Sequence, residues 1–137
     1  MLFRSELASV APGAAVLQAT TWVSTVFLNR GGRFEARPLP AEAQWTPALG
    51  VNVADFDGDG SEDVFLSQNF FGGASNLSRE DSGRGLWMRG KGDGSFVPVD
   101  AATSGVRIEG EQRGAAVADF NHDGRVDLAV EIGRAHV

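Results

Sequence analysis

Four carboxylates alternate along a short acidic segment near the middle of the chain, at Asp55, Asp57, Asp59 and Asp63. Alternate residues of a tight loop can turn several oxygen atoms toward one point, and Ser61 can add its backbone carbonyl. Because Ca²⁺ takes roughly six to eight oxygen ligands in flexible geometry, this donor set predicts a calcium site. Gly60 follows three closely spaced anions, where the chain must turn sharply and a residue without Cβ adopts a positive φ at little cost.

The same segment recurs at an offset of 64 residues, from Asp55 to Asp119. Its acidic positions hold Asp119, Asn121, Asp123 and Asp127, so one carboxylate is replaced by an amide. Residues 26–34 and 86–96 also correspond, at nearly the same offset. Internal periods of this length are typical of propellers, solenoids and repeat arrays.

An EF-hand also begins with alternating aspartates followed by a glycine. It requires a bidentate glutamate at position twelve and a helix on each side, whereas position twelve is Leu66 in the first loop and Val130 in the second. Both residues stand in runs rich in β-branched or aromatic residues, which favour strands. The EF-hand is therefore excluded, and an acidic surface turn without a metal remains as the alternative to a calcium loop.

The composition favours an all-β protein and excludes several classes of function. Gly occurs 18 times in 137 residues, which suits a chain with many tight turns. The formal net charge of −6 argues against a nucleic-acid partner, which requires clustered Lys and Arg. Cysteine is absent, so thiolate metal sites and cysteine nucleophiles are excluded. No apolar run reaches roughly 18 residues, so membrane insertion is not expected.

Each copy of the repeat is expected to contribute about four short strands. In the first copy, a hairpin within residues 20–39 precedes a β-loop-β unit that runs from Val51 to Leu66 around the acidic loop. In the second copy, residues 86–99 form the corresponding hairpin. We therefore divide the chain into a poorly defined N-terminal segment (1–19), a first repeat (20–69), a loop (70–85) and a second, truncated repeat (86–130).

Residues 131–137 depart from the pattern of the first copy. Their sequence, Glu-Ile-Gly-Arg-Ala-His-Val, matches the translation of a common sequencing-library adapter. We expect this segment to be a non-native tail and exclude it from inferences about fold and function. A natural polar tail is the alternative, and an independent read of the source gene would distinguish the two.

The acidic loops, with their Val-Ala-Asp-Phe entry and their Asp-Val or Asp-Leu exit, resemble the FG-GAP (VCBS) repeats of integrin-α-like β-propellers. Residues 110–120 are similar to bacterial repeat proteins that carry an ASPIC/UnbV domain, the cartilage acidic protein-like group. The resemblance implies four-stranded antiparallel blades with calcium in a loop between two strands, in a secreted, periplasmic or cell-surface protein. It places the metal ligands at Asp55, Asp57, Asp59, Ser61 and Asp63 in one repeat, and at Asp119, Asn121, Asp123, Arg125 and Asp127 in the next. Arg125, like Ser61, would contribute only its carbonyl oxygen.

We predict a partial β-propeller of about two four-stranded antiparallel blades, with calcium-binding loops between strands. Two repeats cannot close a propeller, so the chain is expected to be a fragment and further blades are expected in the full-length protein. Its role is predicted to be protein or glycan binding, or scaffolding, with structural calcium. Two alternatives are the non-catalytic propeller part of a larger polysaccharide-active enzyme, and a purely structural spacer.

No catalytic constellation is predicted from the sequence. Ser, His and Asp are present, but their spacing does not gather a nucleophile and a base, and no glycine loop has a phosphate-binding pattern. Trp22, Trp45 and Trp87 are predicted to pack in the core or between blades, with a sugar site as the alternative. The chain is therefore not expected to be an enzyme.

Overall fold

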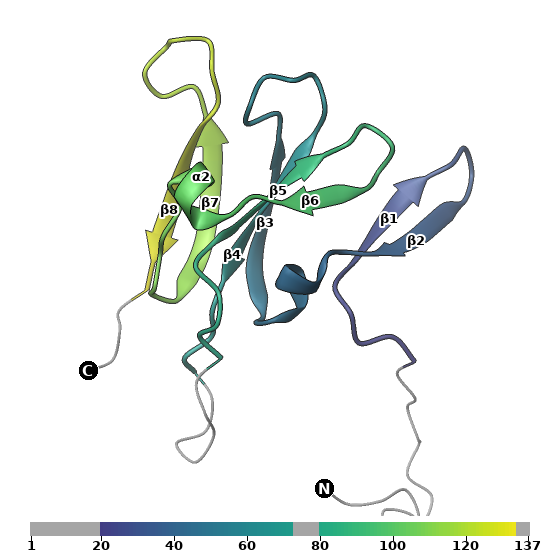
Figure 1. The fold of residues 1–137 in the computed structure, drawn as a ribbon, viewed down its shortest axis with the longest axis horizontal. Helices are drawn as coiled ribbons and strands as arrows, with labels where there is room; N and C mark the ends of the chain where they lie inside the picture. Colours follow the sequence, from purple (N-terminus) through teal and green to yellow (C-terminus); the bar gives the residue numbers. More distant parts are fainter. Residues whose placement is uncertain (1–19, 73–79, 134–137) are drawn as a thin grey trace, which may run out of the picture.

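The computed structural model describes residues 20–72 and 80–133. In these residues the chain is built almost entirely of strands (Figure 1). The strands are β1 (Thr25–Asn29), β2 (Phe34–Pro38), β3 (Ala48–Ala54), β4 (Asp63–Gln68), β5 (Leu86–Gly90), β6 (Phe96–Pro98), β7 (Gln112–Ala118) and β8 (Asp127–Ile132). Two short helical turns accompany them, η1 (Ala41–Gln44) and α2 (Ala101–Ser104).

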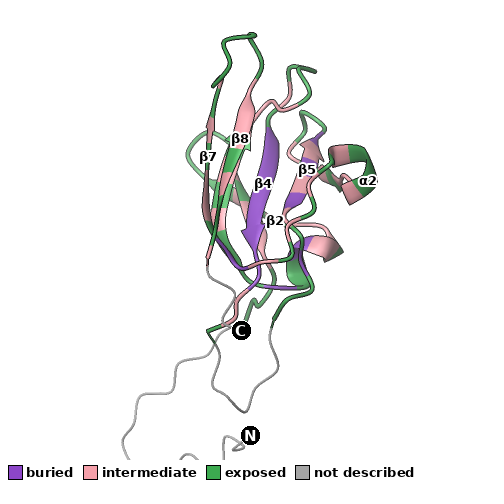
Figure 2. Cartoon of the chain, turned by 90° about the vertical axis from the view of Figure 1, so that its left-hand side faces the viewer, coloured by how far each residue is buried: buried purple, intermediate pink, exposed green. Residues whose placement is uncertain are grey.

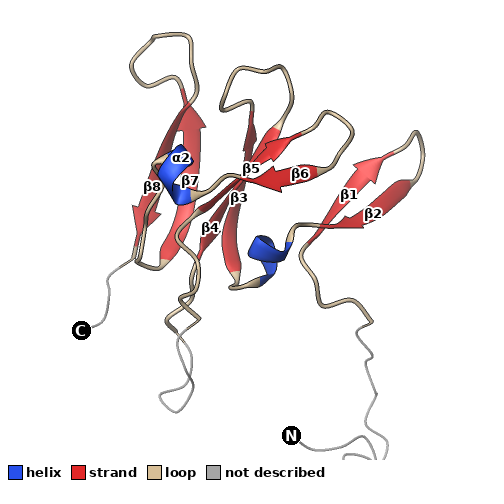
Figure 3. Ribbon diagram, viewed as in Figure 1, coloured by secondary structure: helices blue, strands red, loops and turns tan. Residues whose placement is uncertain are grey.

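The strands form three antiparallel sheets that stand side by side (Figure 3). The central sheet has four strands in the order β3-β4-β5-β6, and two-stranded sheets, β1-β2 and β7-β8, flank it. The β3–β4 and β7–β8 loops lie at the same end of the molecule (Figure 1). The predicted all-β architecture of partial propeller blades is confirmed.

The division into two blades of four strands needs correction. The first acidic hairpin, β3-β4, does not share a sheet with the β1-β2 hairpin that precedes it; β4 pairs instead with β5, with Val64 opposite Met88 and Leu66 opposite Leu86. The second acidic hairpin stands apart as β7-β8. The sheets are thus shifted by one hairpin relative to the repeats at 20–69 and 86–130. These repeat bounds describe sequence similarity, and they stay a prediction.

Burial explains why β4 takes a partner on each edge. All six of its residues are buried (Figure 2). Val64 and Leu66 pack with Leu86, Met88 and Ala43 in one core cluster, whereas Phe65 alternates with them and points to the opposite face. A strand that is covered on both faces cannot leave its backbone groups unpaired. The edge of β4 that is not taken by β3 is therefore covered by β5.

Glycines shape the two hairpin turns that carry no acidic cluster. Gly31 and Gly32 have φ values of 70° and 93° between β1 and β2, which confirms the turn predicted at this position. Between β5 and β6, Asp93 accepts hydrogen bonds from the backbone N–H of Ser95 (2.8 Å) and from its hydroxyl (2.6 Å). The hydrogen bond from the Ser95 hydroxyl is the main reason that the pKa of Asp93 lies below its usual value. This segment is a hairpin turn, as predicted.

The central sheet and the β7-β8 sheet approach each other at two glycines that occupy equivalent positions of the repeat. A Cβ on Gly50 would lie 3.4 Å from the Cα of Gly114. Two residues further, the side-chain amide of Asn52 donates a hydrogen bond of 3.1 Å to the carbonyl oxygen of Ala115. β3 and β7 therefore lie close together at Gly50, and the amide of Asn52 fixes their relative position.

Several segments of the sequence-based division lie outside or at the margin of the described residues. Residues 1–19 lie outside them, as do 73–79 of the predicted loop; the flanks of that loop are joined by a bridge between Phe70 and Glu80. Of the predicted non-native tail, Glu131 and Ile132 continue β8, opposite Gly114 and Gln112. Backbone pairing does not depend on the origin of a sequence, so the prediction about this tail stays open.

Replacing Gly90 by alanine is expected to destabilise the chain by about 3 kcal/mol, because overpacking forces the backbone to move. A Cβ on Gly90 would overlap the carbonyl oxygen of Glu62. Gly114→Ala is the matched control, since a Cβ there meets nothing within 4 Å. The control is expected to be neutral or stabilising by about 0.4–1 kcal/mol through the unfolded state. Urea unfolding of the two variants measures both effects, and equal losses would contradict the close packing at Gly90.

Candidate metal centre

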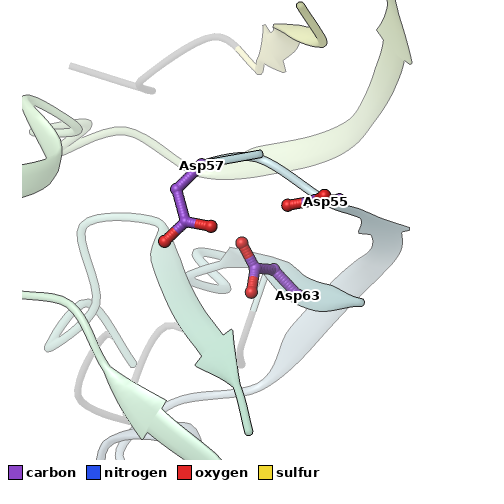
Figure 4. A group of neighbouring side chains, drawn as sticks. All are labelled: Asp55, Asp57 and Asp63. Atoms are coloured by element: carbon purple, nitrogen blue, oxygen red, sulfur yellow. The ribbon is translucent and has the colours of Figure 1, made fainter. Parts of the chain in front are cut away.

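Three aspartates of the β3–β4 loop bring their carboxylates together. Asp55 directly follows β3, Asp57 lies in the loop, and Asp63 begins β4. One oxygen from each lies within 4.8 Å of the others, and Figure 4 shows the three carboxylates facing a common space. Three acidic oxygens that converge in this way are a donor set for a hard cation such as Ca²⁺.

The loop folds because Asp55 organises its backbone. The Oδ1 atom accepts hydrogen bonds from the N–H of Gly58 (2.8 Å) and of Asp59 (3.1 Å), and Oδ2 accepts one from Gly60 (2.9 Å). Gly58 and Gly60 have φ values of 77° and 86°, a region that glycine enters at little cost. The glycine spacing therefore lets successive N–H groups point inward at one carboxylate.

Asp63 connects the loop to the neighbouring strand. It is fully buried, and three donors satisfy it: the N–H of Phe56 (3.2 Å), the N–H of Gly90 (2.8 Å) and the indole Nε1–H of Trp87 (3.0 Å). Two of these donors belong to β5. A carboxylate offers roughly four acceptor positions, so Asp63 can hold these three donors and still offer an oxygen to a cation.

Asp57 faces a positive charge from β5, the strand that also holds Asp63. The guanidinium Nε of Arg89 forms an ion pair with Oδ2 of Asp57. The guanidinium also lies 5.6 Å from the centre of the Trp87 ring, whose other neighbour is Phe56, packed edge to face at 6.3 Å. The first loop therefore rests on two side chains of β5, one aromatic and one cationic.

The second loop has nearly the same backbone. Asp119 accepts hydrogen bonds from the N–H of Asp123 (3.0 Å) and of Gly124 (2.9 Å). His122 has a φ of 61° and occupies the position of Gly58, in a conformation that histidine adopts more often than most residues. The repeat therefore reproduces the local geometry even where the glycine is lost.

The side chains of the second loop are arranged differently. The amide of Asn121 donates a hydrogen bond of 3.1 Å to Asp123, which its carboxylate counterpart Asp57 cannot do. Asp127 is only partly buried and accepts a hydrogen bond from the N–H of Phe120 at 2.9 Å. Within residues 20–72 and 80–133, the cluster of three carboxylates forms in the first loop alone.

The structure thus brings together some of the predicted ligands and leaves the rest apart. Asp55, Asp57 and Asp63 converge, whereas Asp59 lies outside the cluster and accepts a hydrogen bond from the N–H of Ser61 (2.8 Å). Of the second loop, the carboxylates of Asp119, Asp123 and Asp127 form no such cluster among the described residues. Carbonyl ligation by Ser61 and Arg125 stays a prediction, as does the full ligand set at both loops.

Sequence reasoning missed the contribution of Trp87 and Arg89. Both lie on β5, more than twenty residues from the loop they contact, so no local spacing connects them with it. Trp87 was predicted to pack in the core or between blades, and it does so only in part. Trp22 and Trp45 are 85 % and 60 % exposed, so neither lies in a core of the described residues. Their packing between blades stays a prediction.

The comparisons with known proteins support a repeat protein. Residues 73–130 match the family described as FG-GAP-like repeat. Over 101 residues the chain is 32 % identical to human cartilage acidic protein 1, a match that covers 71 % of this chain and 13 % of that protein. The identity to cartilage acidic protein 1 of Xenopus tropicalis is 28 % over 85 residues, or 62 % of this chain and 11 % of the relative.

Three further findings accompany these matches. The chain spans only about an eighth of the length of these relatives, as the 11 % and 13 % coverage shows. No solved structure gives a significant match. Among the described residues, no helix is long and apolar enough to cross a membrane.

Proposed function

Because this chain is an FG-GAP-like repeat protein related to cartilage acidic protein 1, we propose that its acidic hairpin loops bind calcium and that the ion has a structural role. The observation that carries this proposal is the convergence of Asp55, Asp57 and Asp63, whose carboxylate oxygens lie within 4.8 Å of one another. Hard oxygen donors of this charge suit Ca²⁺. The repetition of the loop after 64 residues supports a second, weaker site.

The position of the first loop favours a structural role over a catalytic one. Asp63 is held by donors from β5, and Arg89 of the same strand contacts Asp57. A cation bound here would neutralise carboxylates at the point where the hairpin β3-β4 meets its neighbour β5. It would therefore stabilise the four-stranded sheet. We propose that this module is non-catalytic, and that it binds a protein or glycan partner or acts as a scaffold.

The proposed location is outside the cell or on its surface. The FG-GAP-like repeat and the relatives named cartilage acidic protein 1 support this. Calcium modules of extracellular proteins typically have dissociation constants of about 10⁻⁴–10⁻³ M, and loops as exposed as these suit that range. Bacterial origin and further propeller blades remain predictions from the sequence.

Calorimetric titration of the metal-free chain with Ca²⁺ tests the proposal. We expect saturable uptake with a dissociation constant near 10⁻⁴–10⁻³ M, and weaker uptake of Mg²⁺, because Mg²⁺ demands near-ideal octahedral geometry and gives up its water reluctantly. The double variant Asp55→Ala, Asp119→Ala serves as the control, since it removes the organising carboxylate of each loop. Equal heats from the double variant and the parent chain would overturn the proposal.

A further inference from the structure

Arg89 lies where a metal ion at the first loop would exert its charge. Three carboxylates converge there, and the Arg89 guanidinium forms an ion pair with one of them, Asp57. A cation bound among these oxygens would share the carboxylate of Asp57 with the guanidinium of Arg89. The two positive charges would repel each other, and solvent would screen this repulsion only in part.

The contact between Arg89 and Asp57 is close, but the Nε–H of Arg89 is poorly aligned for a hydrogen bond. The Nε atom is buried, yet among the described residues it has no aligned hydrogen bond, even though it lies within ion-pair distance of Asp57. The attraction is therefore mainly coulombic and lacks the directional bond of a bidentate arginine–carboxylate pair. Arg89 is therefore held at Asp57 mainly by charge, and a cation bound at the same carboxylate would compete with it.

Arg89 also lies near the Trp87 ring and is partly exposed to solvent. Its guanidinium lies 5.6 Å from the centre of the Trp87 ring, and 41 % of its side-chain surface is exposed. The guanidinium can therefore leave Asp57 for water without carrying its charge into the core. Trp87 itself stays fixed, because its indole Nε1–H donates to Asp63.

We propose that Arg89 is a built-in counter-ion of the first loop, which neutralises Asp57 in the metal-free chain and is displaced when a divalent cation binds. This inference rests on the proposed calcium function and adds a regulatory element to it. Arg89 lowers the affinity of the loop for the cation, and at the same time reduces the repulsion among the carboxylates when the cation is absent. Trp87 reports the exchange, because the guanidinium near its ring moves.

Three variants separate charge from geometry. Arg89→Gln removes the charge, Arg89→Lys keeps a charge without the planar guanidinium, and Lys91→Gln removes a neighbouring exposed charge as the matched control. By calorimetric titration with Ca²⁺, Arg89→Gln is expected to lower the dissociation constant of the first loop about tenfold, from the coulombic repulsion that it removes. Arg89→Lys is expected to remain within about threefold of the parent chain because it keeps the positive charge. Lys91→Gln is expected to do the same because exposed charges act weakly at a distance.

Fluorescence gives a second readout that does not depend on heats of binding. Trp22→Phe and Trp45→Phe leave Trp87 as the single tryptophan of the chain. In this background, saturating Ca²⁺ is expected to shift the Trp87 emission. The metal-free Arg89→Gln variant is expected to show much of the same shift without Ca²⁺, because it lacks the guanidinium near the ring. Circular dichroism confirms that each variant keeps its β structure.

The outcomes separate the two proposals. If neither the parent chain nor any variant takes up Ca²⁺, the proposed calcium function is wrong, and the proposed role of Arg89 is wrong with it. If the chain takes up Ca²⁺ but Arg89→Gln leaves the affinity and the Trp87 emission unchanged, only the role of Arg89 is wrong. Weaker binding by Arg89→Gln would also overturn it, because Arg89 would then hold Asp57 in its ligating position.

Discussion

Replacing Asp63 by alanine is expected to lower the free energy of unfolding by about 3–5 kcal/mol, even in the presence of a chelator. The carboxylate is fully buried and accepts hydrogen bonds from Phe56, Trp87 and Gly90. Its removal would leave three donors without a partner, at a cost of about 1–3 kcal/mol for each donor that is fully buried. The loss would also separate the acidic loop from β5, which supplies two of the donors.

Asp127→Ala provides the matched comparison, because Asp127 holds the same position in the second loop. It is only partly buried and accepts a hydrogen bond from Phe120, so its loss is expected to cost about 1 kcal/mol. Urea unfolding of both variants in chelator excludes any contribution from bound metal. Losses of equal size would show that the hydrogen bonds from β5 add nothing to the stability of the first loop.

Saturating calcium is expected to raise the free energy of unfolding by about 2.7 kcal/mol for each site that is held at a hundred times its dissociation constant. The first loop is expected to bind more tightly than the second. It carries four carboxylates at the predicted ligand positions, three of which converge, whereas the second loop carries three and an amide, and calcium affinity follows the charge of its ligands. The Arg89 contact reduces this difference without reversing it, because one positive charge faces three converging carboxylates.

A pair of exchanged variants tests the ranking of the two loops. Asp57→Asn gives the first loop the amide of the second, and Asn121→Asp gives the second loop the carboxylate of the first. The first change is expected to weaken the tighter site and the second to strengthen the weaker one, so that the two affinities approach each other. Unfolding with and without Ca²⁺, together with calorimetric titration, measures both. A second loop that already binds as tightly as the first would contradict the assignment of ligands by charge.

The local parts of this structure could be predicted from the sequence because their causes are local. The alternation of Asp55, Asp57 and Asp59 with Gly58 and Gly60 specifies a loop whose N–H groups turn inward, and the hydrogen bonds to Asp55 are the result. The offset of 64 residues then identified the second loop. The positive φ of His122, at the position of Gly58, became evident only in the structure.

The pairing of hairpins could not be predicted in the same way. Residues 25–38 and 86–98 carry similar patterns, so each acidic hairpin could join the hairpin before it or the one after it without any change in its own alternation. The choice depends on which edge of β4 the apolar side chains of Leu86 and Met88 can reach. That contact crosses a loop of more than fifteen residues. For the same reason, the contacts of Trp87 and Arg89 with the acidic loop left no signal in the spacing.

The shift between repeat and sheet has a consequence for how such a protein can grow by gene duplication. A duplicated segment with the bounds of the FG-GAP-like match, residues 73–130, carries β5 and β6 of one sheet together with β7 and most of β8 of the next. Each new copy therefore adds the last two strands of one sheet and the first two strands of the next. The repeated segment and the sheet are therefore different pieces of chain, and a boundary between repeats falls within a sheet.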